Sequence, residues 1–203
     1  MFDKISLEKL KEDESKVVFE KDKSYLLAYP EFLQYFKDID VITRHHLVIG
    51  IHFTYGWMPT IFNFRKDETE FDNVVAILNK VKQGSWLTAE ELDLLRTCFN
   101  NSLVGVSKLL HFINPENYAI WDSRVYRYIK GKDAWQHQIH DYDTYLAYLQ
   151  FCKGIISQPA FQPLHQSMMN KVGYEITALR SLELIMFKNG TASRADNIID
   201  SNA

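Results

Sequence analysis

Apolar side chains recur along the chain at steps of three and four residues, the spacing of one face of an α-helix. One such stripe is formed by Phe71, Val74, Val75, Leu78 and Val81. It predicts a helix that Gln83-Gly84-Ser85 closes. Similar stripes predict helices within 92–99, 142–156 and 176–186. No stretch alternates apolar and polar residues between hairpin turns, so we expect no sheet.

This pattern predicts an all-α fold. We expect a single compact helical domain over residues 1–188, built from about eight to ten helices. Residues 189–203 are small, polar and patternless, which predicts a disordered tail.

Composition fits a globular protein, with 46% hydrophobic and 14% aromatic residues among 203. The net charge of −3 excludes a protein coated in positive charge but leaves room for a local basic patch.

Cys98 and Cys152 lie inside predicted helices and are expected to be buried thiols in a reducing compartment. The first 23 residues are charged throughout, and the longest apolar stretch, 47–58, is too short and polar to span a bilayer. We therefore expect a cytoplasmic protein with no membrane partner.

Positive charge and aromatic rings gather in one segment near the middle of the chain. Between residues 103 and 132, five Lys or Arg stand against two acids, a local charge of +3. A helix is expected to end near Asn100, and a turn containing Gly105 leads to a second helix that carries Lys108. Asn114-Pro115 stops that helix, and Asp122 opens a third.

Two short motifs in this segment match a known family. Leu103-Val104-Gly105-Val106 follows part of the pattern Leu-Pro-Gly-Val-Gly, and Ile120-Trp121 precedes Asp122-x-x-Val125-x-Arg127. The segment thus resembles the helix-hairpin-helix DNA glycosylases, the superfamily of endonuclease III and 8-oxoguanine glycosylase. Val104 and Ser107 stand where that family has Pro and a second Gly. Lys108 falls one position early, and Asp122 follows it after only 14 positions, about one helical turn fewer than in the family.

The resemblance implies a glycosylase-like helical fold and DNA as the partner. The residues themselves show no motif for a metal or a cofactor, and we expect neither. Asp122 would be the catalytic carboxylate, and Lys108 the nucleophile of an enzyme that also has lyase activity. Phosphate would be gripped by backbone N–H groups at a helix N-terminus, close to small residues. The implied DNA-binding residues are Gly105, Ser107, Arg124, Arg127 and Lys130.

A glycosylase of this kind brings a carboxylate and a stacking surface to one extruded nucleotide. We therefore expect Lys108, Asp122 and Arg124 on one side of the molecule, bordering a concave pocket lined by aromatic side chains. One ring of the run Phe53, Tyr55, Trp57 and Phe62 could stack on the base. The apolar side of the segment should be buried, namely Leu103, Val106, Leu110, Phe112, Ile120, Trp121 and Val125.

Simpler interpretations remain open for each residue. Asp122 suits a helix N-cap, Lys108 a solvated surface lysine, and His111 a packed side chain. Arg180 and Glu183, at i and i+3, suit an ion pair on a helix surface or between helices. His45, His46 and His52 lack a carboxylate that would complete a metal cluster.

The function also has an alternative from another class. The chain would then be a non-catalytic helical module that binds a partner protein or nucleic acid, for example in a bacterial defence or toxin–antitoxin system. The imperfect hairpin motif and the acidic net charge favour it.

Overall fold

The computed structural model describes residues 2, 4–20, 23–58, 60–64 and 68–191. Over these residues the chain forms eleven α-helices and one short 3-10 helix, and no strand. The predicted all-α class is therefore confirmed, with slightly more helices than the expected eight to ten. The elements are α1 (Leu7–Ser15), α2 (Ser24–Lys37), α3 (Arg44–Trp57), α4 (Glu68–Lys82), α5 (Ala89–Cys98), α6 (Leu103–Ile113), α7 (Ser123–Lys130), α8 (Gln136–Ile139), α9 (Tyr142–Ile156), η1 (Pro159–Phe161), α10 (Gln162–Val172) and α11 (Ala178–Asn189).

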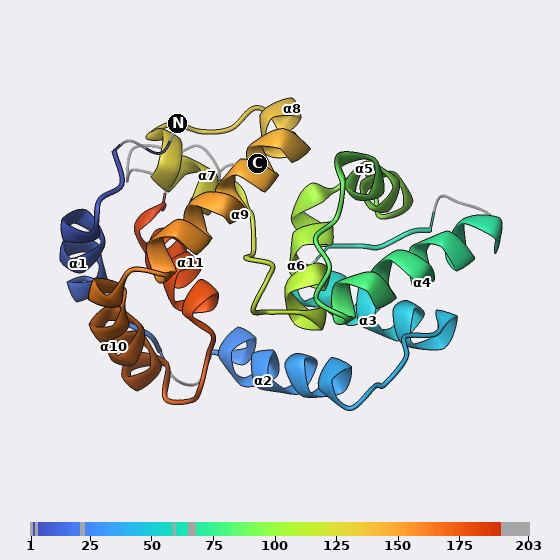
Figure 1. Cartoon of the computed structure of the whole chain (residues 1–203), viewed down its shortest axis with the longest axis horizontal. Coiled ribbons are helices and arrows are strands. Elements are labelled where there is room, and N and C mark those ends of the chain that lie inside the picture. Colours follow the sequence, from blue (N-terminus) through green and yellow to red (C-terminus); the bar gives the residue numbers. More distant parts are fainter. Residues whose placement is uncertain (1, 3, 21–22, 59, 65–67, 192–203) are drawn as a thin grey trace, which may run out of the picture.

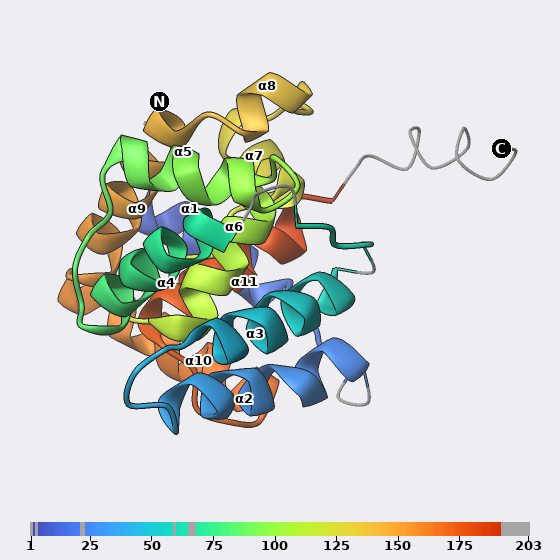
Figure 2. The same cartoon turned by 90° about the vertical axis from the view of Figure 1, so that its right-hand side faces the viewer.

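Most of the other helices pack against one of two central helices, α6 or α11. Helices α2, α3, α4 and α5 contact α6, whereas α1, α7, α9 and α10 contact α11. The two groups lie on opposite sides of the molecule in Figure 1, and α2 and α3 run side by side in Figure 2. Within α6 every residue is buried except Val104 and Lys108. A helix that is buried on nearly all sides lies inside a core, which explains its almost wholly apolar sequence.

The predicted turn around Gly105 is wrong. Helix α5 ends at Cys98, and residues 99–102 form the turn, where Asn100 and Asn101 take the left-handed conformation with φ of 54° and 52°. Gly105 is instead the third residue of α6. A Cβ atom there would lie 2.4 Å from the Tyr55 hydroxyl. The glycine is therefore needed for close packing of α3 on α6 rather than for a turn.

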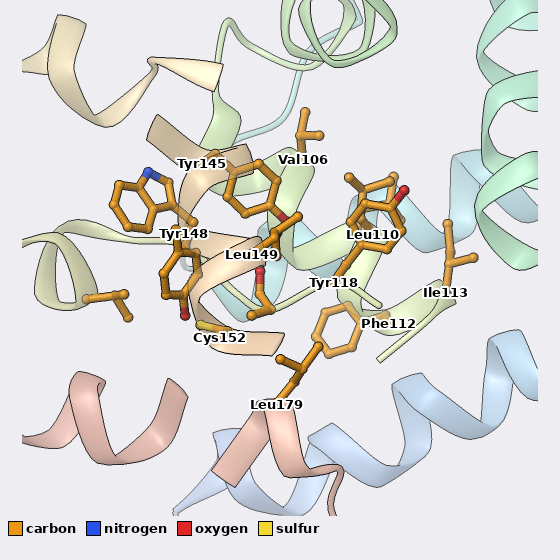
Figure 3. Packing of buried hydrophobic residues seen from close by; sticks show 14 of the residues in the cluster. Val106, Leu110, Phe112, Ile113, Tyr118, Tyr145, Tyr148, Leu149, Cys152 and Leu179 are labelled. Carbon is orange, nitrogen blue, oxygen red and sulfur yellow. Dashed lines mark hydrogen bonds between the residues drawn. The ribbon is translucent and has the colours of Figure 1, made fainter. Parts of the chain in front are cut away.

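The core between α6 and α9 is rich in aromatic rings. Figure 3 shows Tyr145 of α9 beside Val106 of α6, with Tyr148 and Cys152 further along α9. All seven residues of the central segment that were predicted to be buried are buried. Both cysteines are buried, as expected.

An extended segment, residues 118–121, passes through this core without a strand partner. Its four carbonyl oxygens instead accept hydrogen bonds from side chains. The donors, in order along the segment, are His111 (2.6 Å), Tyr145 (3.1 Å), Tyr148 (3.2 Å) and Ser107 (3.1 Å). A buried carbonyl without a partner costs free energy, so these side chains make the buried path possible. The next residue, Asp122, is thereby fixed in place.

The C-terminal part of the chain departs from the expected boundary at residue 189. Asn189 is the last residue of α11, and its side-chain amide donates to the Asp13 carbonyl at 3.1 Å. The rest of the predicted tail, residues 192–203, lies outside the described residues. Across the described part of the chain, no helix is both long and apolar enough to cross a membrane.

Candidate active site

A cavity of about 210 Å³ opens where the two helix groups meet. Four charged side chains line it: Lys108 from α6, Asp122 at the start of α7, and Arg180 and Glu183 from α11. Tyr25, Trp57 and Phe187 supply aromatic walls. Charged groups are rarely buried together without a functional reason, so this cavity is the candidate active site.

Lys108 enters the cavity from one of the two positions of α6 that are not fully buried. Its Nζ lies 5.6 Å from the centre of the Trp57 ring. Among the described residues, none forms a hydrogen bond or ion pair with it. Burial lowers the pKa of Lys108, Asp122 and Glu183 oppose that shift, and Arg180 adds to it. The interpretation of Lys108 as a solvated surface lysine is therefore wrong.

Asp122 both caps a helix and faces the cavity. Its Oδ1 accepts hydrogen bonds from the backbone N–H groups of Arg124 and Val125, each at 3.0 Å. That cap was predicted from the sequence and is confirmed. Oδ2 accepts no hydrogen bond from the described residues, and Asp122 and Lys108 form no ion pair. Because the residue lines the cavity, one carboxylate oxygen remains available to a ligand.

Arg180 and Glu183 form an ion pair within α11, and both are buried. The expectation of a surface or interhelical pair is wrong, because the pair lies on the wall of the cavity inside the protein. The Arg180 guanidinium also lies 4.6 Å from the centre of the Tyr29 ring and 5.7 Å from that of Trp57. Burial raises the pKa of Glu183 to about 7, even though the charges of Arg180 and Lys108 act to lower it.

A signal for this burial was present in the sequence. The residues next to the pair include Leu179, Leu182, Leu184, Ile185 and Met186, which cover more than one face of the helix. A helix that is apolar on several faces belongs in a core, so a charged pair within it must be buried.

The aromatic wall comes partly from the run singled out in the sequence. Of that run, Trp57 lines the cavity, and its indole N–H donates to the Tyr25 carbonyl at 3.1 Å. Tyr55 is buried, and its hydroxyl donates to the Phe99 carbonyl at 2.8 Å. Phe187 and Tyr25 were not identified from the sequence, and they complete the aromatic wall.

His111, one helical turn beyond Lys108, is a packed residue, as one interpretation expected. Its Nδ1 donates to the Tyr118 carbonyl, so Nε2 accepts from the Tyr29 hydroxyl at 2.7 Å. Burial, with a smaller contribution from Arg180, lowers the pKa of His111 to about 3. The ring is therefore neutral and serves the fold rather than the cavity.

The five implied DNA-binding residues are not gathered on one surface. Gly105 and Ser107 are buried inside the core. Arg127 pairs with Asp133 and donates to the Gly190 carbonyl at 2.6 Å. Lys130 lines a separate hollow with Tyr126 and Tyr142.

Arg124 alone of the five is exposed beside the cavity. Its guanidinium lies 4.7 Å from the centre of the Phe187 ring, and Phe187 lines the cavity. Lys108, Asp122 and Arg124 thus border the same region.

The cavity continues into a shallow groove. Lys108 and Asp122 also line a second hollow, together with Val104 and His140. Val104 and His140 in turn border a third hollow, which reaches the turn at Asn100. At the start of α6, the Leu103 N–H donates to His140 Nδ1 at 3.2 Å. A phosphate grip at this helix end would compete with that hydrogen bond.

Comparison of the chain with protein-family models, with curated proteins and with solved structures finds no match. Its function must therefore be argued from the cavity and from the sequence motif.

Proposed function

We propose that this protein is a DNA glycosylase, which binds a nucleotide turned out of the duplex and cleaves its N-glycosidic bond. One observation carries the proposal. Lys108 and Asp122, the two residues that the sequence motif marks, line one cavity that has an aromatic wall. A flipped base is commonly held by stacking and by hydrogen bonds to its edge. Arg180 and Glu183 offer such hydrogen bonds.

Asp122 would act on the sugar. Cleavage of a glycosidic bond develops positive charge on the sugar ring, and a carboxylate beside that charge stabilises it. Oδ1 is occupied by the helix cap, which holds the side chain still. Oδ2 is then presented to the sugar, or to a water molecule that attacks C1′. Preorganisation by the cap lowers the cost of orienting the group.

Lys108 would add a second activity. A lysine amine attacks C1′ only when it is neutral, and burial favours the neutral form. The positive charge of Arg180 acts in the same direction and lowers the pKa of Lys108 further. Attack by Nζ would give a Schiff base with the opened sugar, which precedes strand cleavage.

The approach of DNA would rely on Arg124 at the rim and on the groove that leaves the cavity past Val104 and His140. The small number of free cations there predicts weak nonspecific binding. The dependence of affinity on salt should accordingly be shallow.

The test uses duplexes that each carry one damaged or modified base. We expect abasic sites from at least one duplex. Asp122→Asn should reduce the yield at least about 100-fold, because asparagine keeps the helix cap but not the charge. Borohydride reduction should crosslink wild-type protein to the reacting duplex, and Lys108→Met should not crosslink.

Two results separate the alternatives. Binding of DNA without any abasic product, unchanged by Asp122→Asn, would support the non-catalytic binding module. The proposal would be contradicted if the protein bound no DNA at low salt and released no base from any duplex of the panel. The matched control is Asp141→Asn, which also changes a helix N-cap but lies outside the cavity.

A further inference from the structure

We propose that Glu183 is the acid that protonates the departing base, and that the substrates are therefore neutral bases rather than permanently cationic, alkylated ones. This inference rests on the proposed function. It assigns the second carboxyl of the cavity to the base and leaves Asp122 to the sugar.

The position of Glu183 carries the inference. The side chain is only 1% exposed, yet it lines the cavity. Arg180 donates to Oε2, and no described residue donates to Oε1. Among the described residues, no fully buried side-chain oxygen lacks a partner, so Oε1 must be open to the cavity. A ligand in the cavity can therefore reach this oxygen.

The surroundings favour a proton on this carboxyl near neutral pH. Burial is the largest cause and raises the pKa of Glu183 to about 7, with a further contribution from Asp122. The titratable groups that interact with it from the neighbouring helices are Tyr29 of α2, Lys108 of α6, Asp122 of α7, Tyr148 and Cys152 of α9, and Arg180 of α11. An acid is most effective when its pKa lies near the working pH.

The proposed step balances as follows. The bond between C1′ and the base nitrogen breaks, and its electron pair stays with the base. Glu183 transfers its proton to a ring nitrogen or a carbonyl oxygen of the base. A water oxygen bonds to C1′, and Asp122 accepts the proton that this water loses. The products are the free base and an abasic sugar, and one water is consumed. Asp122 then releases its proton to solvent, and Glu183 regains one from solvent, so both carboxyls return to their starting states.

The chemistry of the leaving group sets the substrate class. A neutral base departs as an anion unless it is protonated, so an acid lowers the barrier. An alkylated purine already carries a positive charge and departs as a neutral molecule without an acid. Arg180 also places positive charge on the wall of the cavity, which disfavours a cationic base.

The experiment compares Glu183→Gln with wild type on duplexes that carry hypoxanthine, uracil or 8-oxoguanine, and on one that carries 7-methylguanine. Glutamine keeps an acceptor for Arg180 but cannot transfer the proton. We expect wild type to release a neutral base, and Glu183→Gln to do so about 10²- to 10⁴-fold more slowly. The wild-type rate of base release should fall as pH rises above about 7, and the rate of the variant should show no such fall. Glu175→Gln, at an exposed position just before α11, is the matched control.

Each contrary result has a distinct meaning. An unchanged rate for Glu183→Gln on the neutral base overturns the role of Glu183 and leaves the proposed function standing. Release of 7-methylguanine alone overturns the substrate class. Release of no base from any duplex overturns the proposed function, and this inference with it. If the variant does not fold, the wild type alone decides: a rate of base release that does not fall as pH rises above about 7 overturns the role of Glu183.

Discussion

The extended segment 118–121 and the cavity beside it both place polar groups inside the protein, but in opposite ways. Along the segment, each backbone carbonyl has a side-chain donor. In the cavity, Lys108 Nζ, one oxygen of Asp122 and one oxygen of Glu183 have no hydrogen-bonding partner among the described residues. Helix α6 contributes to both regions, because His111 donates to the segment and Lys108 lines the cavity.

Whether a buried polar group has all its hydrogen-bonding partners indicates whether it serves the fold or binds a ligand. A buried polar group whose partners are complete stabilises one backbone path. A cavity-lining polar group with an open position costs stability and is retained when it binds something. Removing a polar group whose partners are complete should therefore reduce stability and change activity little. Removing a cavity-lining group with an open position should reduce activity and change stability little.

Arg180 lines the cavity but is expected to matter for stability, because it forms an ion pair with the buried Glu183. Arg180→Met leaves a buried carboxylate without its partner, so at pH 8 we expect a loss of about 3–5 kcal/mol in the free energy of unfolding. Lys108→Met removes a cation that has no hydrogen-bonding partner among the described residues, so no loss in the free energy of unfolding is expected. Urea unfolding measures both, and equal losses would contradict the comparison.

The sequence was informative about Asp122 and Lys108 because their signals are local. An aspartate before Val125 and Arg127 predicts a cap, and the motif attaches chemistry to it. The pairing of Arg127 with Gly190 joins positions 63 residues apart, which no local pattern reveals. For the same reason, the environment of Glu183 depends on how α11 lies against α6 and α7.

The contributions of the two regions to the free energy of unfolding should also change with pH in opposite directions. His111 has a pKa of about 3 in the folded state against an ordinary 6.5, so its contribution is complete above 6.5 and is lost as pH falls toward 3. Glu183 has a pKa of about 7 against 4.5, so its contribution is complete below 4.5 and is lost as pH rises toward 7. Each slope is at most about 1.4 kcal/mol per pH unit.

Between pH 4.5 and 6.5 these slopes oppose each other in the wild type. Glu183→Gln should make the free energy of unfolding rise with pH across that window, and His111→Gln should make it fall. Chemical unfolding at several pH values measures both. His45→Gln, at an exposed position, is the control and should leave the profile unchanged. Slopes of the same sign in the two variants would contradict these assignments.

A smaller effect is expected within the segment itself. Tyr148→Phe leaves the Ile120 carbonyl without its side-chain donor, which should cost about 1–3 kcal/mol. Tyr142→Phe, on the same helix, removes a hydroxyl that makes no hydrogen bond to the described residues, and little change is expected. Thermal unfolding of the two variants compares them. DNA binding by folded Tyr148→Phe should match wild type, and a selective loss of binding would place Tyr148 in the functional region.

The central claim is that the open carboxylate oxygen of Asp122 stabilises positive charge on a sugar in DNA. The most direct measurement is the affinity for a duplex with one pyrrolidine in place of a nucleoside, whose protonated ring nitrogen resembles the sugar cation. We predict binding at least about 100-fold tighter than to the unmodified duplex, as expected for a transition-state analogue. Asp122→Asn should lose that preference while remaining folded. Equal affinity of the wild type for both duplexes would contradict the account.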